Sequence, residues 1–331
     1  MRNKDYLDLA ALIIGYSRPT GVANLLERLT ECGVRNIYIA IDGPRNLKDR
    51  LEQEKIKSEI ENHSKNLNIR VLQRDINLGA AAGVISALDW FFSHEKMGII
   101  LEDDLQISKD FCTYAKNALD QYVQDEDVWM ISGTQHFPNF GNSKETNWTN
   151  YPMVWGWAGW SQKWNIMRTS LLKSKKVRAR NLFDSNYLFW AIGANRALCG
   201  KIDAWDIPLA FEFKSQKKLS LLPPVNLVSN IGDDKFATNT ASSSQFMHQR
   251  LEHLDNDYKY SDKPIGNIVL EYDIFLEKKV FKVRMKHIGL PYYSFLLDFI
   301  RFPKSTRKMP LNERLRNQSS MSSACLSKFK I

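Results

Sequence analysis

The chain has 331 residues, 44% of them hydrophobic and 25% charged, with a formal net charge of +9. This is ordinary globular composition, and the length allows two domains or one large α/β domain with extensions. No stretch reaches the roughly 18 apolar residues that span a bilayer, and the apolar run 9–14 is too short for a signal peptide. An integral membrane protein and a secreted precursor are therefore disfavoured.

The cysteines carry no recognisable framework. They are scattered, without the paired spacing of a zinc site or of a disulfide-linked domain: Cys32, Cys112, Cys199 and Cys325. Such usage suits a reducing compartment. We therefore expect a cytoplasmic protein.

Apolar runs and helical periodicity alternate along the first 133 residues. The expected strands are 9–15, 36–41, 68–72, 98–101 and 128–132, and the expected helices are 19–30, 47–66, 80–92 and 108–122. Alternation at a period of about 30 residues is typical of βαβ units in a mostly parallel, doubly wound sheet. The first strand is not followed by GxGxxG or a Walker A loop, which disfavours dinucleotide oxidoreductases and P-loop NTPases.

The second half is less regular. We expect helices over 187–200 and 208–217, and a strand-like run over 219–228. Pro223 and Pro224 interrupt that run, so it is predicted to be an edge or irregular strand. Residues 241–260 are polar, and we expect them to be partly disordered.

Three consecutive carboxylates, Glu102, Asp103 and Asp104, follow the apolar strand 98–101. Open α/β sheets bind ligands outside the carboxyl ends of their strands. Like charges this close repel, so one carboxyl group should take up a proton unless a hard divalent cation is present. The alternative is a solvated acidic turn in which Asp104 or Ser108 caps the next helix.

Two other strand ends carry polar groups that would meet the triplet at one edge of the sheet. They are Ser17-Arg18 after the first strand and Asp42 with Arg45 after the second. A carboxylate can accept from the imide of a uracil-type base, and an arginine can meet a ribose or phosphate. The combination predicts a nucleotide-sugar site. Taken alone, Asp42 is equally a turn former and Arg18 a surface charge.

A tryptophan-rich segment, VWGWAGW, contains Trp155, Trp157 and Trp160. Indole faces stack on sugar rings, so these side chains are candidates for binding the acceptor or the donor sugar. The alternative is a tryptophan-rich hairpin in the core under the sheet.

In the order of its motifs the sequence resembles the GT-A nucleotide-sugar glycosyltransferases, and among them bacterial relatives of the N-acetylglucosaminyltransferase I family. The resemblance covers about residues 9–240. Its motifs here are YSRP, AIDGP, RDINLG, ILEDDL, VWGWAGW, DAWDIP and VSNIGDD. It implies a Rossmann-like, mostly parallel central sheet flanked by helices, to which this chain adds a basic, helical C-terminal extension.

The resemblance also implies roles for individual residues. The triplet is the counterpart of the DXD motif, with Asp104 the metal ligand for Mn2+ or Mg2+ and Asp103 nearer the ribose or sugar. Asp206 stands where an inverting enzyme holds its general base, and Asp203 competes for that role. Helix capping is the alternative for either aspartate. We predict donor binding for Ser17, Arg18, Asp42, Arg45, Asn77, Gly79, Glu102 and Asp103.

The predicted function is metal-dependent, inverting sugar transfer from a nucleotide sugar, preferably a UDP-sugar, to a glycan or lipid-linked acceptor in surface polysaccharide biosynthesis. The alternatives are a nucleotidyltransferase and a non-catalytic carbohydrate- or membrane-binding protein. We expect a donor-binding half over 1–133, an acceptor-binding and catalytic half over 134–240, and a linker and tail over 241–331. No nucleic-acid partner is expected.

Asn239 stands where family members often carry a histidine.

The tail carries the positive charge of the chain. Residues 278–331 hold 13 Lys and Arg but only 2 Asp and Glu. Basic residues flank an aromatic, apolar run over 291–302, which suits a helix lying in the interface of an anionic membrane. The alternative is that the apolar face packs on the catalytic body.

Overall fold

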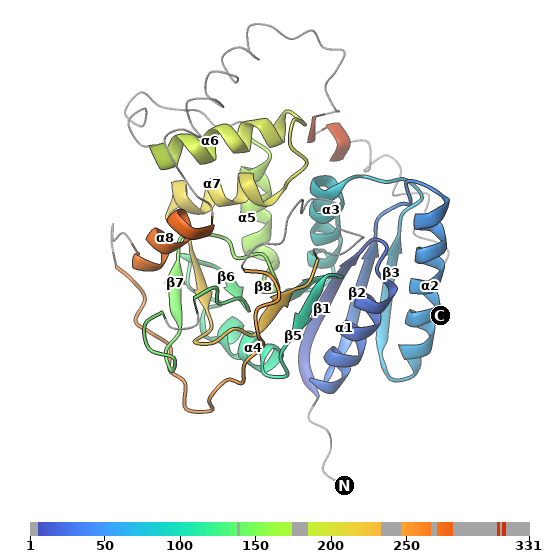
Figure 1. Ribbon diagram of the computed structural model, residues 1–331, viewed down its shortest axis with the longest axis horizontal. Helices are drawn as coiled ribbons and strands as arrows, with labels where there is room; N and C mark the ends of the chain where they lie inside the picture. The colour runs from blue at the N-terminus through green and yellow to red at the C-terminus, as the bar shows by residue number, and fades with distance from the viewer. Residues whose placement is uncertain are drawn as a thin grey trace, which may run out of the picture.

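The computed structural model describes residues 6–137, 140–173, 185–232, 246–265, 270–280, 310–311 and 313–315. Its centre is an eight-stranded sheet in the order β3-β2-β1-β4-β8-β6-β9-β7, with helices on both faces (Figure 1). The predicted α/β class, with a mostly parallel central sheet flanked by helices, is confirmed.

The first half follows the predicted alternation closely, because each strand is a short apolar run and each helix has one apolar face. Its elements are β1 (Leu7–Gly15), α1 (Pro19–Glu31), β2 (Val34–Ile41), α2 (Leu47–His63), η1 (Ser64–Asn66), β3 (Asn68–Gln73), α3 (Ala80–Phe92), β4 (Met97–Glu102), α4 (Phe111–Gln121) and β6 (Val128–Ser132). β1 pairs in parallel with β2 and with β4, and β2 pairs in parallel with β3.

Alternate residues of the strands face two separate apolar layers. On β1, Leu9, Ala11 and Ile13 pack in one cluster with apolar residues of α1, α2 and α4. Ala10 and Leu12 pack in the other cluster, which is built from α3, α5 (Ser161–Leu171) and α7 (Asp206–Gln216). A sheet covered on both faces buries its strands fully, which is why they read as continuous apolar runs.

The second half adds antiparallel strands to this sheet. β8 (Trp157–Trp160) lies between β4 and β6 and is antiparallel to both. β9 (Leu219–Leu222) lies between β6 and β7 (Asn147–Thr149), so of the two alternatives for 219–228 the edge strand is wrong. The run is interrupted after Leu222, as the irregular alternative expects. Pro223 and Pro224 are tolerated because they follow β9. A separate antiparallel pair, β5 (Leu105–Ile107) and β10 (Val228–Asn230), was not predicted.

The remaining described segments pack on this body. Residues 241–260 were expected to be partly disordered, but among the described ones Leu254, Tyr258 and Tyr260 contact the core. The backbone of Lys259 also forms an isolated parallel β-bridge with that of Glu145. The helices of the second half are α5, α6 (Ser185–Leu198), α7, α8 (Glu271–Phe275) and the π-helical turn η3 (Leu276–Val280).

Several residues on which the sequence predictions rest lie outside the described part of the chain. They are Asp233 and Asp234 of the VSNIGDD motif, Asn239, and the aromatic run 291–302 of the tail. In the parts of the chain that the structure describes, no helix has the length and apolar character to cross a bilayer.

Candidate active site

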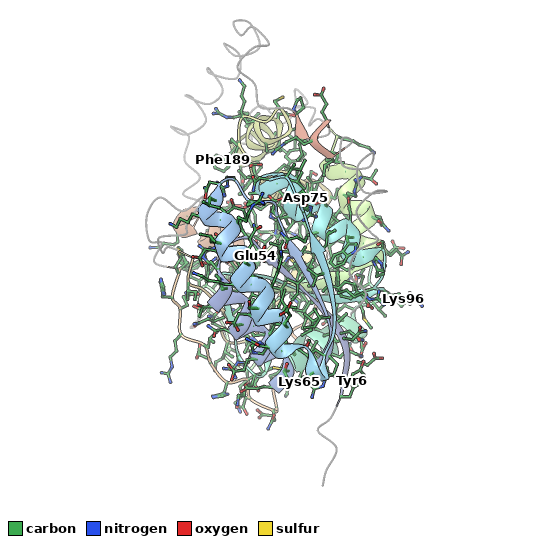
Figure 2. The ribbon with its side chains drawn as sticks, turned by 90° about the vertical axis from the view of Figure 1, so that its right-hand side faces the viewer. Tyr6, Glu54, Lys65, Asp75, Lys96 and Phe189 are labelled. Atoms are coloured by element: carbon green, nitrogen blue, oxygen red, sulfur yellow. The ribbon has the colours of Figure 1, made fainter. Side chains whose placement is uncertain are left out.

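The parallel strands bring the predicted strand ends together. Ile14 pairs with Glu102, and Gly15 pairs with Ile41, so the residues after β1, β2 and β4 meet at one edge of the sheet. Figure 2 shows the direction: Asp75, after β3, lies at the opposite end of the molecule from Tyr6 and Lys65, which precede strands. This edge is where the sequence placed the site.

Asp103 is the buried centre of the edge. Its side chain accepts from the backbone N–H of Tyr16 at 2.7 Å and from Nη1 of Arg18 at 3.2 Å, and the residue is 6% exposed. Gly21 lets α1 approach, because a Cβ there would lie 1.9 Å from the backbone oxygen of Asp103. These contacts make Asp103 a group that holds the ends of β1 and β4 in place.

Arg18 connects the triplet to β10. Its Nη1 lies 3.6 Å from Oδ2 of Asp104, and its Nη2 donates to the carbonyl oxygen of Gly232 at 3.3 Å. A Cβ at Gly232 would lie 2.3 Å from Asp104 Oδ2, so the backbone after β10 is packed closely against the triplet. Arg18 is therefore an ion-pair partner of the acids, and its alternative as a solvated surface charge is wrong.

The pKa of Glu102 is raised even though Arg18 lies nearby. Burial and the charges of Asp104, Asp103 and Asp206 raise its pKa to about 8, while Arg18 acts in the opposite direction. A carboxyl group with this pKa is largely protonated at pH 7. This agrees with the expectation that one member of the triplet takes up a proton when no cation is present.

The donor chemistry of this edge suits a hard cation, since carboxylate oxygens are the preferred ligands of Mg2+ and Mn2+. Among the described residues, however, no group of three or more His, Cys, Asp or Glu is arranged to hold a metal ion. Glu102 and Asp104 could supply only part of a ligand set. The rest would have to come from the diphosphate of a substrate and from water.

Asp206 reaches the triplet from a distant part of the sequence. It begins α7, and its charge contributes to the raised pKa of Glu102, so the two acids share one electrostatic environment. Asp206 is exposed at the surface, but the surrounding protein atoms partly desolvate its carboxyl group, and this desolvation raises its pKa. The backbone N–H groups of Asp206 and Ile207 lower the pKa to a smaller extent. An exposed carboxyl with a raised pKa is suited to accept a proton.

Asp203 has a different task. Its Oδ2 accepts from the N–H of Ala80, and its Oδ1 accepts from the N–H of Ala81, both at 3.1 Å. It also receives Arg314. Asp203 therefore caps α3, as its capping alternative expects, and the assignment of the base to Asp206 stays a prediction.

Asp42 holds the loop before α3. It accepts from the backbone N–H groups of Gly43, Leu78 and Gly79 at 3.0 to 3.2 Å. Burial raises its pKa, while these bonds and the charge of Arg74 lower it. Two features require a glycine at position 79: its φ of +79° lies in the left-handed region, and a Cβ there would lie 2.3 Å from Oδ2 of Asp203. These contacts support positioning roles for Asp42 and Gly79.

The other predicted donor-binding residues lie near this loop or beside β1. Asn77 donates to the carbonyl oxygen of Gly43 at 2.8 Å, and Ser17 is buried. Arg45 is exposed and donates from Nε to the hydroxyl of Tyr16 at 2.8 Å. The Tyr16 hydroxyl in turn donates to Asp49, and this small cluster was missed because Asp49 lies 33 residues after Tyr16, outside the motifs.

The three tryptophans of the VWGWAGW segment differ in their burial. Trp157 is 1% exposed and packs 6.4 Å from the ring of Trp205, and Trp160 is 4% exposed with its indole N–H on the carbonyl oxygen of Leu119. A stacking role for Trp157 and Trp160 is therefore wrong, because both are core residues.

Trp155 is the one of the three that is partly exposed. It precedes β8, whose register pairs Ile100 with Trp157, so it lies towards the triplet end of β4. Its ring meets that of His136 at 5.3 Å. Burial lowers the pKa of His136 to about 4, so this ring is neutral at pH 7. Trp155 remains a candidate for contact with a sugar.

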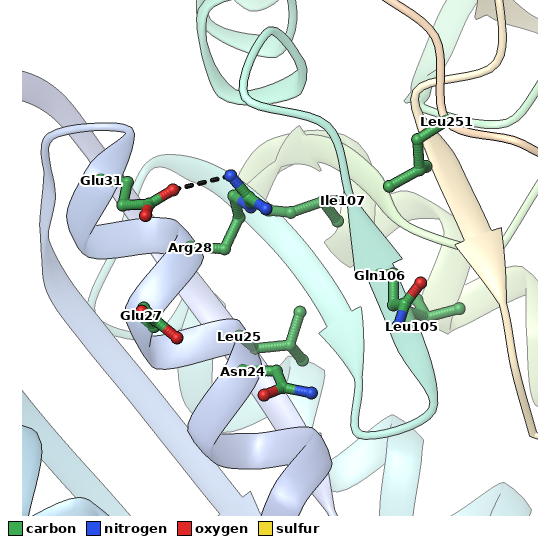
Figure 3. A pocket seen from close by; sticks show the side chains of 9 residues that line it. All are labelled: Asn24, Leu25, Glu27, Arg28, Glu31, Leu105, Gln106, Ile107 and Leu251. Carbon is green, nitrogen blue, oxygen red and sulfur yellow. Dashed lines mark hydrogen bonds and ion pairs between the residues drawn. The ribbon is translucent and has the colours of Figure 1, made fainter.

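A hollow lies between α1 and β5 (Figure 3). Its volume is about 310 Å³, and Arg28 in its wall is already paired with Glu31 at 2.6 Å. Ligand pockets begin at about this size. None of the triplet acids lines it, so we do not assign it to the site.

No protein-family model matches the chain, and no curated protein matches its sequence. Among solved structures, it is similar to 4-diphosphocytidyl-2C-methyl-D-erythritol synthase from Anaerococcus prevotii, with 12% identity, a TM-score of 0.34, and coverage of 53% of this chain and 81% of that one.

Two further solved structures are similar to the chain. For glucosyl-3-phosphoglycerate synthase from Mycobacterium tuberculosis the identity is 9% and the TM-score 0.31, with coverage of 49% and 58%. For an active-site mutant of LgtC the identity is 9% and the TM-score 0.30, with coverage of 48% and 59%. The match spans less than two thirds of either protein. At these identities and TM-scores the similarity does not establish a family.

Proposed function

We propose that the protein is an inverting glycosyltransferase of the GT-A type that transfers a sugar from a nucleotide-sugar donor, preferably a UDP-sugar. The single observation that carries the proposal is the cluster of three acids, Glu102, Asp103 and Asp104, at the carboxyl end of β4, beside the end of β1. Burial and the charges of the neighbouring acids, including Asp206, raise the pKa of Glu102 there. Ionisable groups whose pKa values are shifted by burial and by neighbouring charges cluster at functional sites.

Asp206 is the proposed general base. The acceptor hydroxyl attacks the anomeric carbon, its proton passes to the Asp206 carboxylate, and the bond from that carbon to the diphosphate oxygen breaks with its electron pair on the diphosphate. An attack opposite the leaving group inverts the configuration. Trp155 is the proposed contact for the acceptor or the donor sugar, because it is partly exposed near the triplet end of β4.

The triplet is proposed to hold a divalent cation with the donor diphosphate. Mn2+ or Mg2+ bound there would neutralise charge on the diphosphate. Asp104 is the direct ligand in this proposal, with Glu102 beside it. Asp103 and Arg18 keep Asp104 in place, and the loop held by Asp42 and Asn77 borders the nucleoside.

The test is a panel of UDP-, GDP- and dTDP-sugars with and without Mn2+, following nucleotide release and sugar transfer. Turnover restricted to one nucleotide and lost in chelator supports the proposal. Conversion that requires pyrophosphate would instead support a nucleotidyltransferase. Absence of both turnover and nucleotide binding would support a non-catalytic binding protein and contradict the proposal.

We further propose a glycan or lipid-linked acceptor of surface polysaccharide synthesis and an anionic membrane surface as partners. The support is the sequence of the tail, with 13 Lys and Arg in residues 278–331. Sedimentation with anionic and neutral liposomes at low and high salt tests it. Binding to anionic vesicles only, lost in high salt and on truncation at Leu276, is expected. Equal recovery of full-length and truncated protein in the supernatant contradicts it.

A further inference from the structure

Described residues near the C-terminus, 310–311 and 313–315, reach the loop before α3. Arg314 donates from Nη1 and Nη2 to Oδ1 of Asp203, both at 3.1 Å, and from Nη1 to the carbonyl oxygen of Leu78 at 3.1 Å. The side chains of Arg314 and Asp203 are only 14% and 22% exposed. One guanidinium group therefore joins three segments that are far apart in the sequence.

These residues are held there by apolar contacts as well. Leu311 is 0% exposed and Leu315 is 6% exposed. Both belong to the apolar cluster that contains residues of α3 and Trp205. Burying two leucine side chains stabilises this position through the hydrophobic effect. The contact of Arg314 with Asp203 is thus supported by packing on both sides of it in the sequence.

Asp203 lies three residues before Asp206. Its carboxylate caps the amides of Ala80 and Ala81, which have no partner within α3 because the first amides of a helix never do. The loop 78–79 on the other side is fixed by Asp42. A change at Arg314 would therefore reach both the 203–206 turn and the loop before α3.

We propose that Arg314 is a positioning residue of the active site, which clamps Asp203 so that the 203–206 turn and the N-terminus of α3 keep one relative placement. The inference rests on the proposed function in its catalytic part, because Asp206 is the base. It assigns a function in the active site to a C-terminal residue that the sequence analysis placed only in a basic tail.

The test compares Arg314→Gln and Arg314→Lys with a matched control, Arg168→Gln. Arg168 pairs with Asp89 on α3 at 2.6 Å, so the control removes an arginine–aspartate pair from the same helix, far along the chain from the cap. Amide hydrogen exchange of the peptide that contains Ala80 and Ala81 is measured together with kcat and KM for the donor.

Arg314→Gln is expected to speed the exchange of Ala80 and Ala81 and to lower kcat on the order of tenfold, because small misplacements of a reacting group are costly. KM for the donor should change less. Arg314→Lys should recover part of kcat, since it keeps the charge but loses the two-nitrogen geometry. Arg168→Gln should leave exchange at Ala80 and Ala81 and kcat near the wild-type values.

Unchanged exchange at Ala80 and Ala81 in both Arg314 variants would overturn the clamp, as would a kcat equal to that of the wild type. If Arg314→Gln does not fold, the lysine variant gives the same two measurements. A wild-type protein without any transfer activity would contradict the proposed function, while the exchange data would still support or overturn the clamp.

Discussion

Nη1 of Arg18 lies 3.6 Å from Oδ2 of Asp104 and 3.2 Å from Oδ1 of Asp103, which links the end of β1 to the end of β4. One arginine faces three consecutive acids, so it cannot neutralise them all. Burial, together with the charges of the neighbouring acids, raises the pKa of Glu102 to about 8, although Arg18 acts in the opposite direction. The site is built with an excess of negative charge, which favours a cationic ligand.

Asp104→Ala is expected to abolish transfer and metal-dependent donor binding while the fold remains intact. Asp104 is partly exposed beside Arg18, and removing it leaves Asp103 to hold the strand ends. Calorimetry with Mn2+ and nucleotide measures the effect. Asp120→Ala removes an acid from an exposed pair with Lys116 and should bind like the wild type. Wild-type affinity in Asp104→Ala would exclude Asp104 as the metal ligand.

Asp206→Asn should lower turnover on the order of a hundredfold or more, with little change in donor binding, because general-base catalysis contributes about that much. The matched variant Asp203→Asn should cost about tenfold through misplacement. Steady-state kinetics and donor titration distinguish the two. A larger loss in Asp203→Asn than in Asp206→Asn would show that the base has been assigned to the wrong aspartate.

Glu102→Gln should stabilise the protein at alkaline pH. The pKa of Glu102 is raised from 4.5 in the unfolded chain to about 8 in the folded one. Between pH 4.5 and pH 8 the folded protein therefore keeps a proton on Glu102 that the unfolded chain has released. The wild type therefore loses stability as the pH rises from about 4.5 to 8. Glutamine removes this loss. Urea unfolding at pH 5.5 and 9 measures it, and an equal difference between the two proteins at both pH values would disprove the shift.

Gly21→Ala should destabilise the protein by about 1–3 kcal/mol, although the same change in a helix usually stabilises by up to about 1 kcal/mol. The added Cβ would lie 1.9 Å from the backbone oxygen of Asp103, which cannot move without shifting the triplet. Gly83→Ala in α3 is the control, since its Cβ would meet nothing closer than 3.4 Å. Thermal unfolding of both variants decides the point, and equal melting temperatures would refute it.

The sequence by itself determined the first half of the fold. Short apolar runs and helical periodicity gave β1 to β4 and α1 to α4 to within a few residues, because these segments obey local rules of period and turn chemistry. The triplet and the ends of β1 and β2 could be placed at one edge because parallel strands end on the same side.

Other features were decided only by tertiary structure. The local sequence around Trp157 and Trp160 does not show that β8 inserts between β4 and β6 and buries both rings. A tryptophan that stacks on a ligand and one that packs in the core are the same residue type in the sequence. The contacts of Arg18 with Asp103, and of Arg314 with Asp203, join residues 85 and 111 positions apart. Such pairs depend on how the whole chain folds, so only the tertiary structure shows that Asp203 accepts from the first amides of α3.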